Sequence, residues 1–156
     1  MGLHHDILSD PVSVLELRQA IAVDRETTVR CAADLMRQKG LGSVVVVNDE
    51  NSPIGKFTER LLLKLLLEKP EGLDDPLGQH MYTESTSVKT SDPIAKLIEC
   101  MDVEKLRYVI VIDEQGHPVG LAGQKSLMEY IVDHFPRQVK VQETATKLHM
   151  DQREGA

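Results

Sequence analysis

The stretch SPIGKFTERLLLKLLL, residues 52–67, decides the fold because it recurs in altered form 65 residues later, as HPVGLAGQKSLMEYIV. Each copy leads from a Pro-hydrophobic-Gly turn through a short strand into an apolar helix. The same shift aligns residues 10–66 with residues 75–131 without a gap, and ten of the 57 aligned pairs are identical. A repeat of this length predicts that the chain is built from two copies of one supersecondary unit.

Periodicity predicts the same elements in both units. In the first unit, Val29, Ala32, Ala33 and Met36 form one helical stripe, which Thr27 or Thr28 can cap and Gly40 can end. The remaining elements are a buried strand, a polar turn, a return strand and a second helix, at 44–47, 48–52, 54–58 and 59–68. In the second unit we expect a helix, two strands and a helix at 92–104, 107–112, 118–122 and 124–135.

The two units together predict the fold class. Short strands around Val23 and Val88 complete a β-α-β-β-α order in each. We therefore predict an α/β (α+β) fold in which two repeats, residues 10–68 and 75–135, pack with pseudo-twofold symmetry. One such unit would bury little core alone, so the two are expected to share one. Residues 68–74 form a short linker and residues 137–156 a polar C-terminal tail.

Composition excludes several classes of protein. The net charge of −7 argues against nucleic-acid binding through bulk electrostatics. The N-terminus lacks a signal-peptide pattern and no apolar run approaches the length of a membrane span, so we expect a cytoplasmic protein. Cys31 and Cys100 fall in predicted helices and read as buried, reduced thiols, while His4-His5 reads as a flexible end.

No catalytic pattern is visible, so we do not expect an enzyme. The six histidines show no metal-ligand spacing. The chain has no P-loop, no G-x-G-x-x-G and no G-x-S-x-G motif. No cofactor is required by any of these observations.

The repeats resemble the tandem cystathionine-β-synthase (CBS) domain pair, or Bateman module. The residues that carry the resemblance are TTVRCAADLMRQKGLGSVVVVNDENSPIGKFTERLLL (27–63) and DPIAKLIECMDVEKLRYVIVIDEQGHPVGLAGQKSLMEYI (92–131). The resemblance implies a non-catalytic regulatory module that binds an adenosine-containing ligand between the repeats: AMP, ADP, ATP or S-adenosylmethionine. It also implies pairing of two modules through their helices.

The family's ligand signature has Thr or Ser after the strand and Asp three residues later, where the carboxylate accepts hydrogen bonds from the ribose. Here these positions are Thr58 and Leu61 in the first unit, and Gly123 and Ser126 in the second. Both ribose carboxylates are therefore altered. The loss of a hydrogen bond to a charged group predicts binding weaker by about 10- to 150-fold unless another residue compensates.

Nearby cations can supply that compensation. Arg60 and Lys125 occupy equivalent positions at the two helix starts, with Lys56 and Arg107 close in sequence. Each can pair with a phosphate, and each can equally be a solvated charge. The apolar walls of an adenine slot are assigned to Val23, Val44, Ile54, Val88, Val109 and Val119, which also read as plain core.

The helix at 59–68 carries leucine at six of its ten positions, too many for one buried face. We therefore expect a homodimer through the helices of both units, with an interface at Leu62, Leu63, Leu66, Met128 and Val132. Two functions remain open: a sensory module that binds an adenosine-containing ligand, and an interaction module with degenerate ligand sites that acts on a regulated protein partner.

Overall fold

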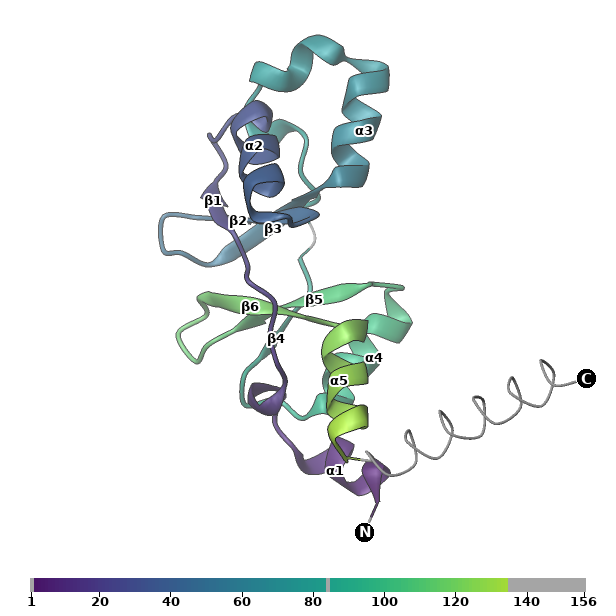
Figure 1. The fold of residues 1–156 in the computed structure, drawn as a ribbon. Helices are drawn as coiled ribbons and strands as arrows, with labels where there is room; N and C mark the ends of the chain where they lie inside the picture. The colour runs from purple at the N-terminus through teal and green to yellow at the C-terminus, as the bar shows by residue number, and fades with distance from the viewer. Residues whose placement is uncertain (1, 84, 135–156) are drawn as a thin grey trace, which may run out of the picture.

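The computed structural model describes residues 2–83 and 85–134 (Figure 1). Its first half contains α1 (Leu3–Ser9), β1 (Ala22–Asp24), α2 (Val29–Lys39), β2 (Ser43–Val47), β3 (Pro53–Thr58) and α3 (Glu59–Glu68). Its second half contains β4 (Ser87–Lys89), α4 (Ile94–Val103), β5 (Tyr108–Ile112), β6 (Pro118–Gly123) and α5 (Gln124–His134). From β1 onward, each element of the first half begins 65 residues before its counterpart, which confirms the two β-α-β-β-α units. The predicted tail, 137–156, lies outside the described residues.

Local signals set the boundaries of α2 as predicted. The Thr28 hydroxyl accepts a hydrogen bond from the Cys31 amide at 3.2 Å, and Gly40 ends the helix in the left-handed conformation with φ 63°. Cys31 corrects one expectation, because its thiol is exposed rather than buried. The buried stripe of α2 consists of Val29, Ala32 and Met36, and residue 31 lies off that stripe. Cys100 is partly buried, and both thiols are free.

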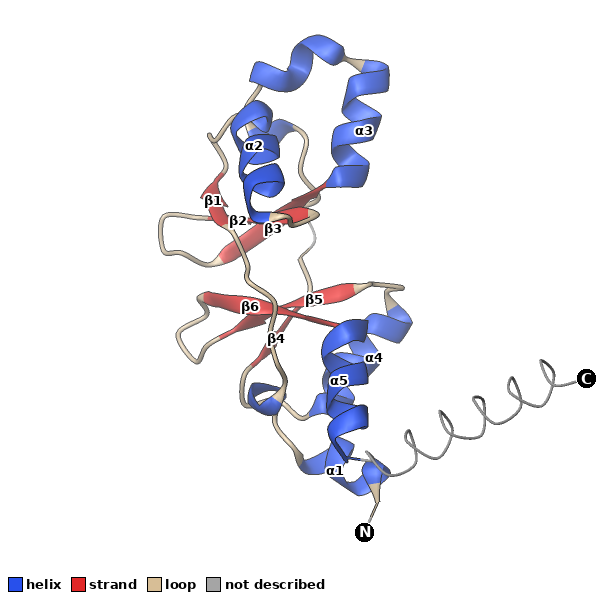
Figure 2. Cartoon of the chain, in the orientation of Figure 1, coloured by secondary structure: helices blue, strands red, loops and turns tan. Residues whose placement is uncertain are grey.

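Each repeat holds one three-stranded sheet, in the orders β1-β2-β3 and β4-β5-β6. The central strand of each sheet is parallel to the first strand and antiparallel to the third. Figure 2 shows the two sheets next to each other in the middle of the molecule, with α2 and α3 at one end and α4 and α5 at the other. This arrangement confirms the predicted α+β fold of two packed repeats.

The valines of β2 alternate between two cores because successive side chains of a strand point to opposite faces. Val44 and Val46 are buried against the helices of their own repeat. Val45 and Val47 instead join Ile110 of β5 and Leu121 of β6 in a cluster between the two sheets. The run is buried over its whole length because both of its faces are covered.

The N-terminal segment belongs spatially to the second repeat. Val12 and Leu15 are buried in the core that contains α4 and α5. The amide of Val12 donates to the carbonyl of Asp92 at 2.8 Å, and the Tyr130 hydroxyl donates to the Asp10 carboxylate at 2.7 Å. Residues 4 and 5, expected to be flexible, instead lie in α1, which contacts α4. The correction follows from tertiary contact, since the second core supplies the surface on which α1 rests.

The segment after α3 makes the reciprocal connection to the first repeat. Leu77 is fully buried in the first core, and the amide of Val29 donates to the carbonyl of Asp75 at 3.0 Å. Lys56 of β3 and Tyr82 exchange two backbone hydrogen bonds, of 3.1 and 2.9 Å. The N-terminal segment thus completes the second repeat, and the segment after α3 completes the first.

Candidate functional site

A hollow of about 220 Å³ lies where the two repeats and the N-terminal segment meet. Its walls are residues 16–19 of the N-terminal segment, Leu41 from the first repeat, and Lys125, Ser126 and Glu129 from the first turns of α5. We call it the Ser126 hollow. Because three separate parts of the chain form it, a molecule bound there would touch both repeats.

Gly120 of the second Pro-hydrophobic-Gly motif allows the N-terminal segment to lie against β6 beside the hollow. Arg18 and Leu121 exchange two backbone hydrogen bonds of 2.9 Å, which hold the segment against β6. A Cβ atom at Gly120 would lie 2.8 Å from Leu17 Cβ and 3.0 Å from the Arg18 carbonyl oxygen. Only glycine leaves room for the N-terminal segment to cross β6 at this point. The sequence analysis did not predict that a segment crosses here.

Ser126 is the notable polar residue of the hollow. Its side chain is 2% exposed, and its hydroxyl has no hydrogen-bond partner among the described residues. A buried hydroxyl without a partner costs about 1–3 kcal/mol, so it is available to a ligand atom. Lys125 and Ser126, two of the predicted site residues, both line the hollow, and Glu16, Arg18 and Glu129 are further polar groups around them.

The charges around the hollow balance one another. Arg18 and Lys125 provide two cations, and Glu16 and Glu129 provide two carboxylates. Lys125 Nζ lies 3.8 Å from Glu129 Oε1, one helical turn along α5, and both side chains remain partly in solvent. This pair is worth little for stability, and either partner can turn toward a ligand.

The equivalent position of the first repeat has a different chemistry. Thr58 caps α3, and its hydroxyl accepts a hydrogen bond from the Leu61 amide at 3.3 Å. Leu61 is partly buried against the first core. At the start of α5 the Ser126 hydroxyl is therefore free among the described residues. At the start of α3 the Thr58 hydroxyl caps the helix, and Leu61 takes the place of the serine.

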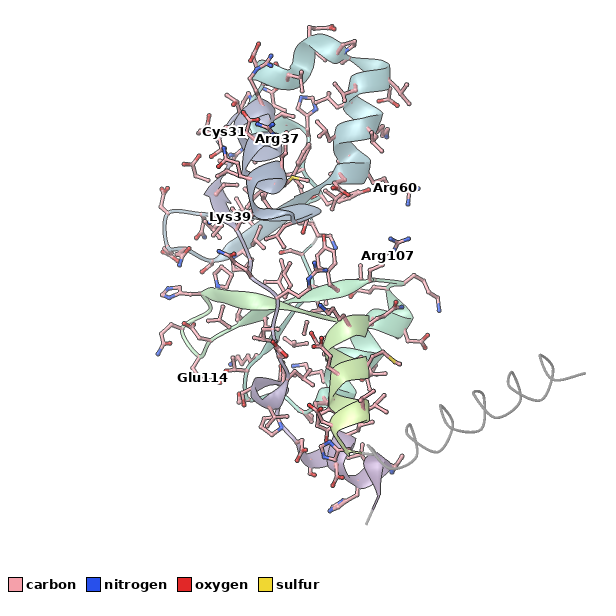
Figure 3. The ribbon with its side chains drawn as sticks, in the orientation of Figure 1. Cys31, Arg37, Lys39, Arg60, Arg107 and Glu114 are labelled. Atoms are coloured by element: carbon pink, nitrogen blue, oxygen red, sulfur yellow. The ribbon has the colours of Figure 1, made fainter. Side chains whose placement is uncertain are left out.

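Three cations come from the segments around this capped helix start and from the facing repeat. Arg60 projects from α3 and Arg107 from the residue before β5, and Figure 3 shows their guanidinium groups pointing toward one another from the two repeats. Lys56 of β3 is partly buried, with its Nζ 5.5 Å from the centre of the Tyr108 ring. We call Lys56, Arg60 and Arg107 the cationic edge.

The six residues assigned to an adenine slot do not line the Ser126 hollow. Val44, Val88 and Val109 are at most 1% exposed and face the helices of their own repeats. Val23 and Ile54 pack at the margin of the first core, and Val119 is 46% exposed. The residues between the sheets are sequence neighbours of the predicted ones and lie on the opposite faces of the strands.

The predicted dimer residues divide into two groups. Leu63, Leu66, Met128 and Val132 are exposed on α3 and α5, with exposed fractions of 64%, 40%, 58% and 40%. Leu62 instead packs against the core of its own repeat. A groove of about 390 Å³ between α4 and the start of α5 adds a second feature to the helical face.

Comparison with known proteins identifies this architecture. The CBS domain family matches the chain twice, over residues 6–68 and 77–133. The chain belongs to the CBS domain family. Its two copies form the tandem CBS pair that the repeat predicted, and proteins of this family are generally regulatory rather than catalytic.

Relatives and solved structures agree with this assignment. The uncharacterized protein MK0525 from Methanopyrus kandleri is 25% identical over 119 residues, which cover 74% of this chain but only 60% of that protein. The CBS domain protein PAE2072 from Pyrobaculum aerophilum, solved with AMP, has a TM-score of 0.67 at 23% identity, covering 75% of this chain and 89% of that one. The CBS domain pair of protein MJ0100, solved with 5′-methylthioadenosine and S-adenosyl-L-methionine, has a TM-score of 0.67 at 14% identity, covering 78% and 94%.

Two features are absent from the described residues. Residues 2–83 and 85–134 contain no group of three His, Cys, Asp or Glu side chains placed to hold a metal ion. Within the same ranges, none of the helices combines the length and the apolar character needed to span a bilayer.

Proposed function

We propose that this CBS pair is a regulatory module that binds an adenosine-containing ligand, such as AMP or S-adenosylmethionine, in the Ser126 hollow. The observation that carries the proposal is the buried, unpartnered Ser126 hydroxyl on the wall of a hollow between the repeats. The ligands in the PAE2072 and MJ0100 structures support the choice of adenosine compounds. No catalytic step is part of this function, and the module would act in the cytoplasm.

The position of the hollow suggests how binding becomes a signal. Leu41 comes from the first repeat, α5 from the second, and residues 16–19 from the N-terminal segment, which runs from the second core to β1. A ligand in contact with all three favours the arrangement in which they lie together. The ligand changes the population of repeat arrangements by its differential affinity for them, and a bound protein partner can respond to that shift.

Isothermal titration calorimetry tests the proposal. Wild-type protein is titrated with AMP, ADP, ATP, 5′-methylthioadenosine and S-adenosylmethionine, and at least one is expected to bind at submillimolar concentration. Ser126→Leu, which gives the second repeat the residue that the first repeat has at Leu61, is expected to lose that binding. Met128→Leu on the exposed face of α5 is the matched control and should bind normally.

The result that would overturn the proposal is equally specific. If Ser126→Leu binds the same ligand with unchanged affinity while remaining folded, the hollow is not the site. If no adenosine compound binds the wild-type protein at millimolar concentration, the sensory function is excluded.

We further propose that the module forms a homodimer through α3 and α5. The exposed side chains of Leu63, Leu66, Met128 and Val132 support a second copy of the chain as the partner. Sedimentation velocity at tens of micromolar should show a dimer, and Leu63→Lys combined with Leu66→Lys should shift it to monomer. Leu8→Lys, a change at an exposed leucine of α1, is the control. A wild-type monomer would contradict this proposal.

A second candidate function is an interaction module without a ligand. Leu61, which occupies the ribose-carboxylate position and packs into the first core, favours it. Under this alternative the exposed leucines of α3 bind a regulated protein partner. Absence of adenosine binding, combined with loss of partner binding in the Leu63→Lys variant, would favour this function over the sensory one.

A further inference from the structure

The outward faces of α3 and α5 are apolar in both repeats. Leu63 and Leu67 are exposed on α3, and Leu67 has the highest exposed fraction of the described large apolar side chains, 87%. The shift of 65 residues places Met128 and Val132, which are also exposed, at the equivalent positions of α5. Leu65, on the opposite face of α3, is buried. Each helix therefore has one apolar face toward its own core and a second toward its surroundings.

These outward faces can be covered together. In the view of Figure 1, α3 and α5 lie on the side of the molecule away from the β2–β3 and β5–β6 turns, one above the two sheets and the other below. A twofold axis can bring a second copy onto them in two ways. In a head-to-head pair, α3 meets the partner's α3 and α5 meets the partner's α5. In a head-to-tail pair, each α3 meets the partner's α5.

The charges of the helices distinguish these two arrangements. The helices of the first repeat, α2 and α3, carry five basic and three acidic side chains, a net charge of +2. The helices of the second repeat, α4 and α5, carry two basic and four acidic side chains, a net charge of −2 with histidine neutral. Head-to-head pairing would bring helices of like net charge together twice. Head-to-tail pairing would bring helices of opposite net charge together twice.

The inversion is present at individual exposed positions. Lys64 on α3 corresponds to Glu129 on α5. Arg37 near the end of α2 corresponds to Asp102 on α4, and Asp102 lines the groove between α4 and α5. Lys64 forms no ion pair with any of the described residues, and Glu129 is 3.8 Å from Lys125 in a pair that remains partly in solvent. Both charges are therefore available to a partner.

We propose that two copies of this chain pair head to tail, with α3 of each copy against α5 of the other. The exposed apolar side chains of both helices are covered in this arrangement, and Lys64 faces the partner's Glu129 on each side of the twofold axis. The inference rests on the homodimer proposed above and adds the arrangement of its two copies. Since the first turns of α5 also form a wall of the Ser126 hollow, a ligand bound there borders the interface.

The salt dependence of dimerisation tests the arrangement without any substitution. Sedimentation velocity at about 50 and about 300 mM NaCl compares Debye lengths of about 14 and about 6 Å. Salt screens the attraction between oppositely charged helices, so the dimer dissociation constant of a head-to-tail pair should rise by at least about twofold. A dissociation constant that falls with salt would indicate contact between helices of like charge and would overturn the proposal.

Chemical cross-linking tests which helices meet. Cys31 and Cys100 are free thiols, so the experiment uses a Cys31→Ser/Cys100→Ala background. Leu63→Cys and Met128→Cys are each added to that background, with tags of different size, and are treated with a short bis-maleimide alone and after co-expression. A head-to-tail dimer should give the mixed-size product from the co-expressed pair and little product from either variant alone. Efficient linkage within each variant alone would overturn the arrangement.

An exchange of charges tests the residues that select it. Lys64→Glu and Glu129→Lys should each weaken dimerisation at least about threefold, because each turns an attraction into a repulsion at two symmetric positions. The combined variant should return to within about twofold of wild type, because the two changes are coupled through the same contact. Arg25→Glu and Glu26→Lys, in the exposed turn after β1, are the matched controls and should dimerise as wild type does. Failure of the combined variant to recover would overturn the pairing of these two charges.

Failure of the arrangement differs from failure of the proposed function. A wild-type dimer that cross-links α3 to α3 overturns the head-to-tail pair and leaves the homodimer intact. A wild-type monomer at tens of micromolar, with no cross-linked product from any variant, overturns the homodimer and the arrangement together. Binding of an adenosine compound in calorimetry is measured separately, so neither result decides whether the Ser126 hollow is a ligand site.

Discussion

The two repeats fill the same backbone frame with differently placed side chains. In the first repeat the buried pair is Phe57 on β3 and Leu65 on α3, and at the equivalent positions the second repeat has Ala122 on β6 and Tyr130 on α5. The aromatic ring has moved from the strand to the helix. Cores tolerate such exchanges when total volume is kept, so the frame survives while the residues change.

The helix starts show what happens where packing constrains less. Leu61 and Ser126 occupy equivalent positions, yet one is packed against a core and the other lines a hollow. The difference teaches that the repeats conserve volume inside and have diverged in chemistry at the space between them.

Removal of the Phe57 ring from β3 should have the largest effect on stability. Phe57 is fully buried, so Phe57→Ala should reduce the free energy of unfolding by about 3–5 kcal/mol. Urea denaturation followed by circular dichroism measures this change. Val119→Ala, at an exposed position of β6, is the control and should change stability little. A loss below about 1 kcal/mol for Phe57→Ala would mean that the first core collapses around the cavity.

The glycines of the two Pro-hydrophobic-Gly motifs should differ in their tolerance. A Cβ at Gly55 would overlap the Tyr82 carbonyl oxygen, a backbone atom, whereas a Cβ at Gly120 would lie 2.8 Å from Leu17 Cβ. We expect both alanine variants to lose about 1–3 kcal/mol in urea denaturation, with the larger loss at Gly55. Gly42→Ala is the control because its nearest neighbour is the flexible end of Glu59, at 3.3 Å. Equal stability of all three variants would show that the crossing segments move aside.

Tyr130 of the second repeat carries a hydroxyl that its counterpart in the first repeat, Leu65, lacks. Burial raises the pKa of Tyr130, and its hydrogen bond to Asp10 raises it further, so the hydroxyl stays protonated and donates. Tyr130→Phe should lose about 1.5–3 kcal/mol, the range for a hydrogen bond to a charged group. A double-mutant cycle with Asp10→Asn isolates the pair. A coupling energy near zero would show that the hydroxyl does not hold the N-terminal segment to the second repeat.

The smallest effect is expected at Asp75, which the shift of 65 residues aligns with Asp10. Hydrogen bonds from Lys69 and then from His80 lower the pKa of Asp75 below its usual value. A lowered pKa in the folded state means that the stabilisation is present above the unfolded-state pKa, about 3.9, and is lost as the pH falls through the folded-state pKa. In urea denaturation between pH 2.5 and 6, Asp75→Asn should therefore lose less stability on acidification than wild type. Asp49→Asn, in the exposed turn after β2, should follow the wild-type curve.

The sequence predicted most of the elements because their signals are local. The valine run marked β2, Thr28 and Gly40 marked the ends of α2, and the gapless shift located every counterpart. It also identified Ser126, Lys125 and Arg60 as the polar residues of the helix starts. The α1 helix was missed, since its seven residues carry little signal without the α4 surface that they contact.

The candidate site was harder to predict because its walls come from distant parts of the chain. Residues 16–19 and Leu41 join α5 at the hollow, and no local period links them. Val44 and Val109 were predicted to line a ligand slot, but they face the helices of their own repeats. A continuous apolar run does not show which face of a strand meets the helices. Val45, Val47 and Ile110 were therefore not recognised as the residues between the sheets.

By itself, the sequence determined the duplication, the order of elements in each repeat and the difference between Leu61 and Ser126. Those features depend on residue type and spacing over a few turns of helix or strand. Only the tertiary structure decided that residues 10–18 complete the second repeat, that residues 75–82 complete the first, and that Arg60 and Arg107 point toward one another. The physical reason is that these arrangements depend on the packing of surfaces far apart in sequence, where burial of apolar area decides which segments meet.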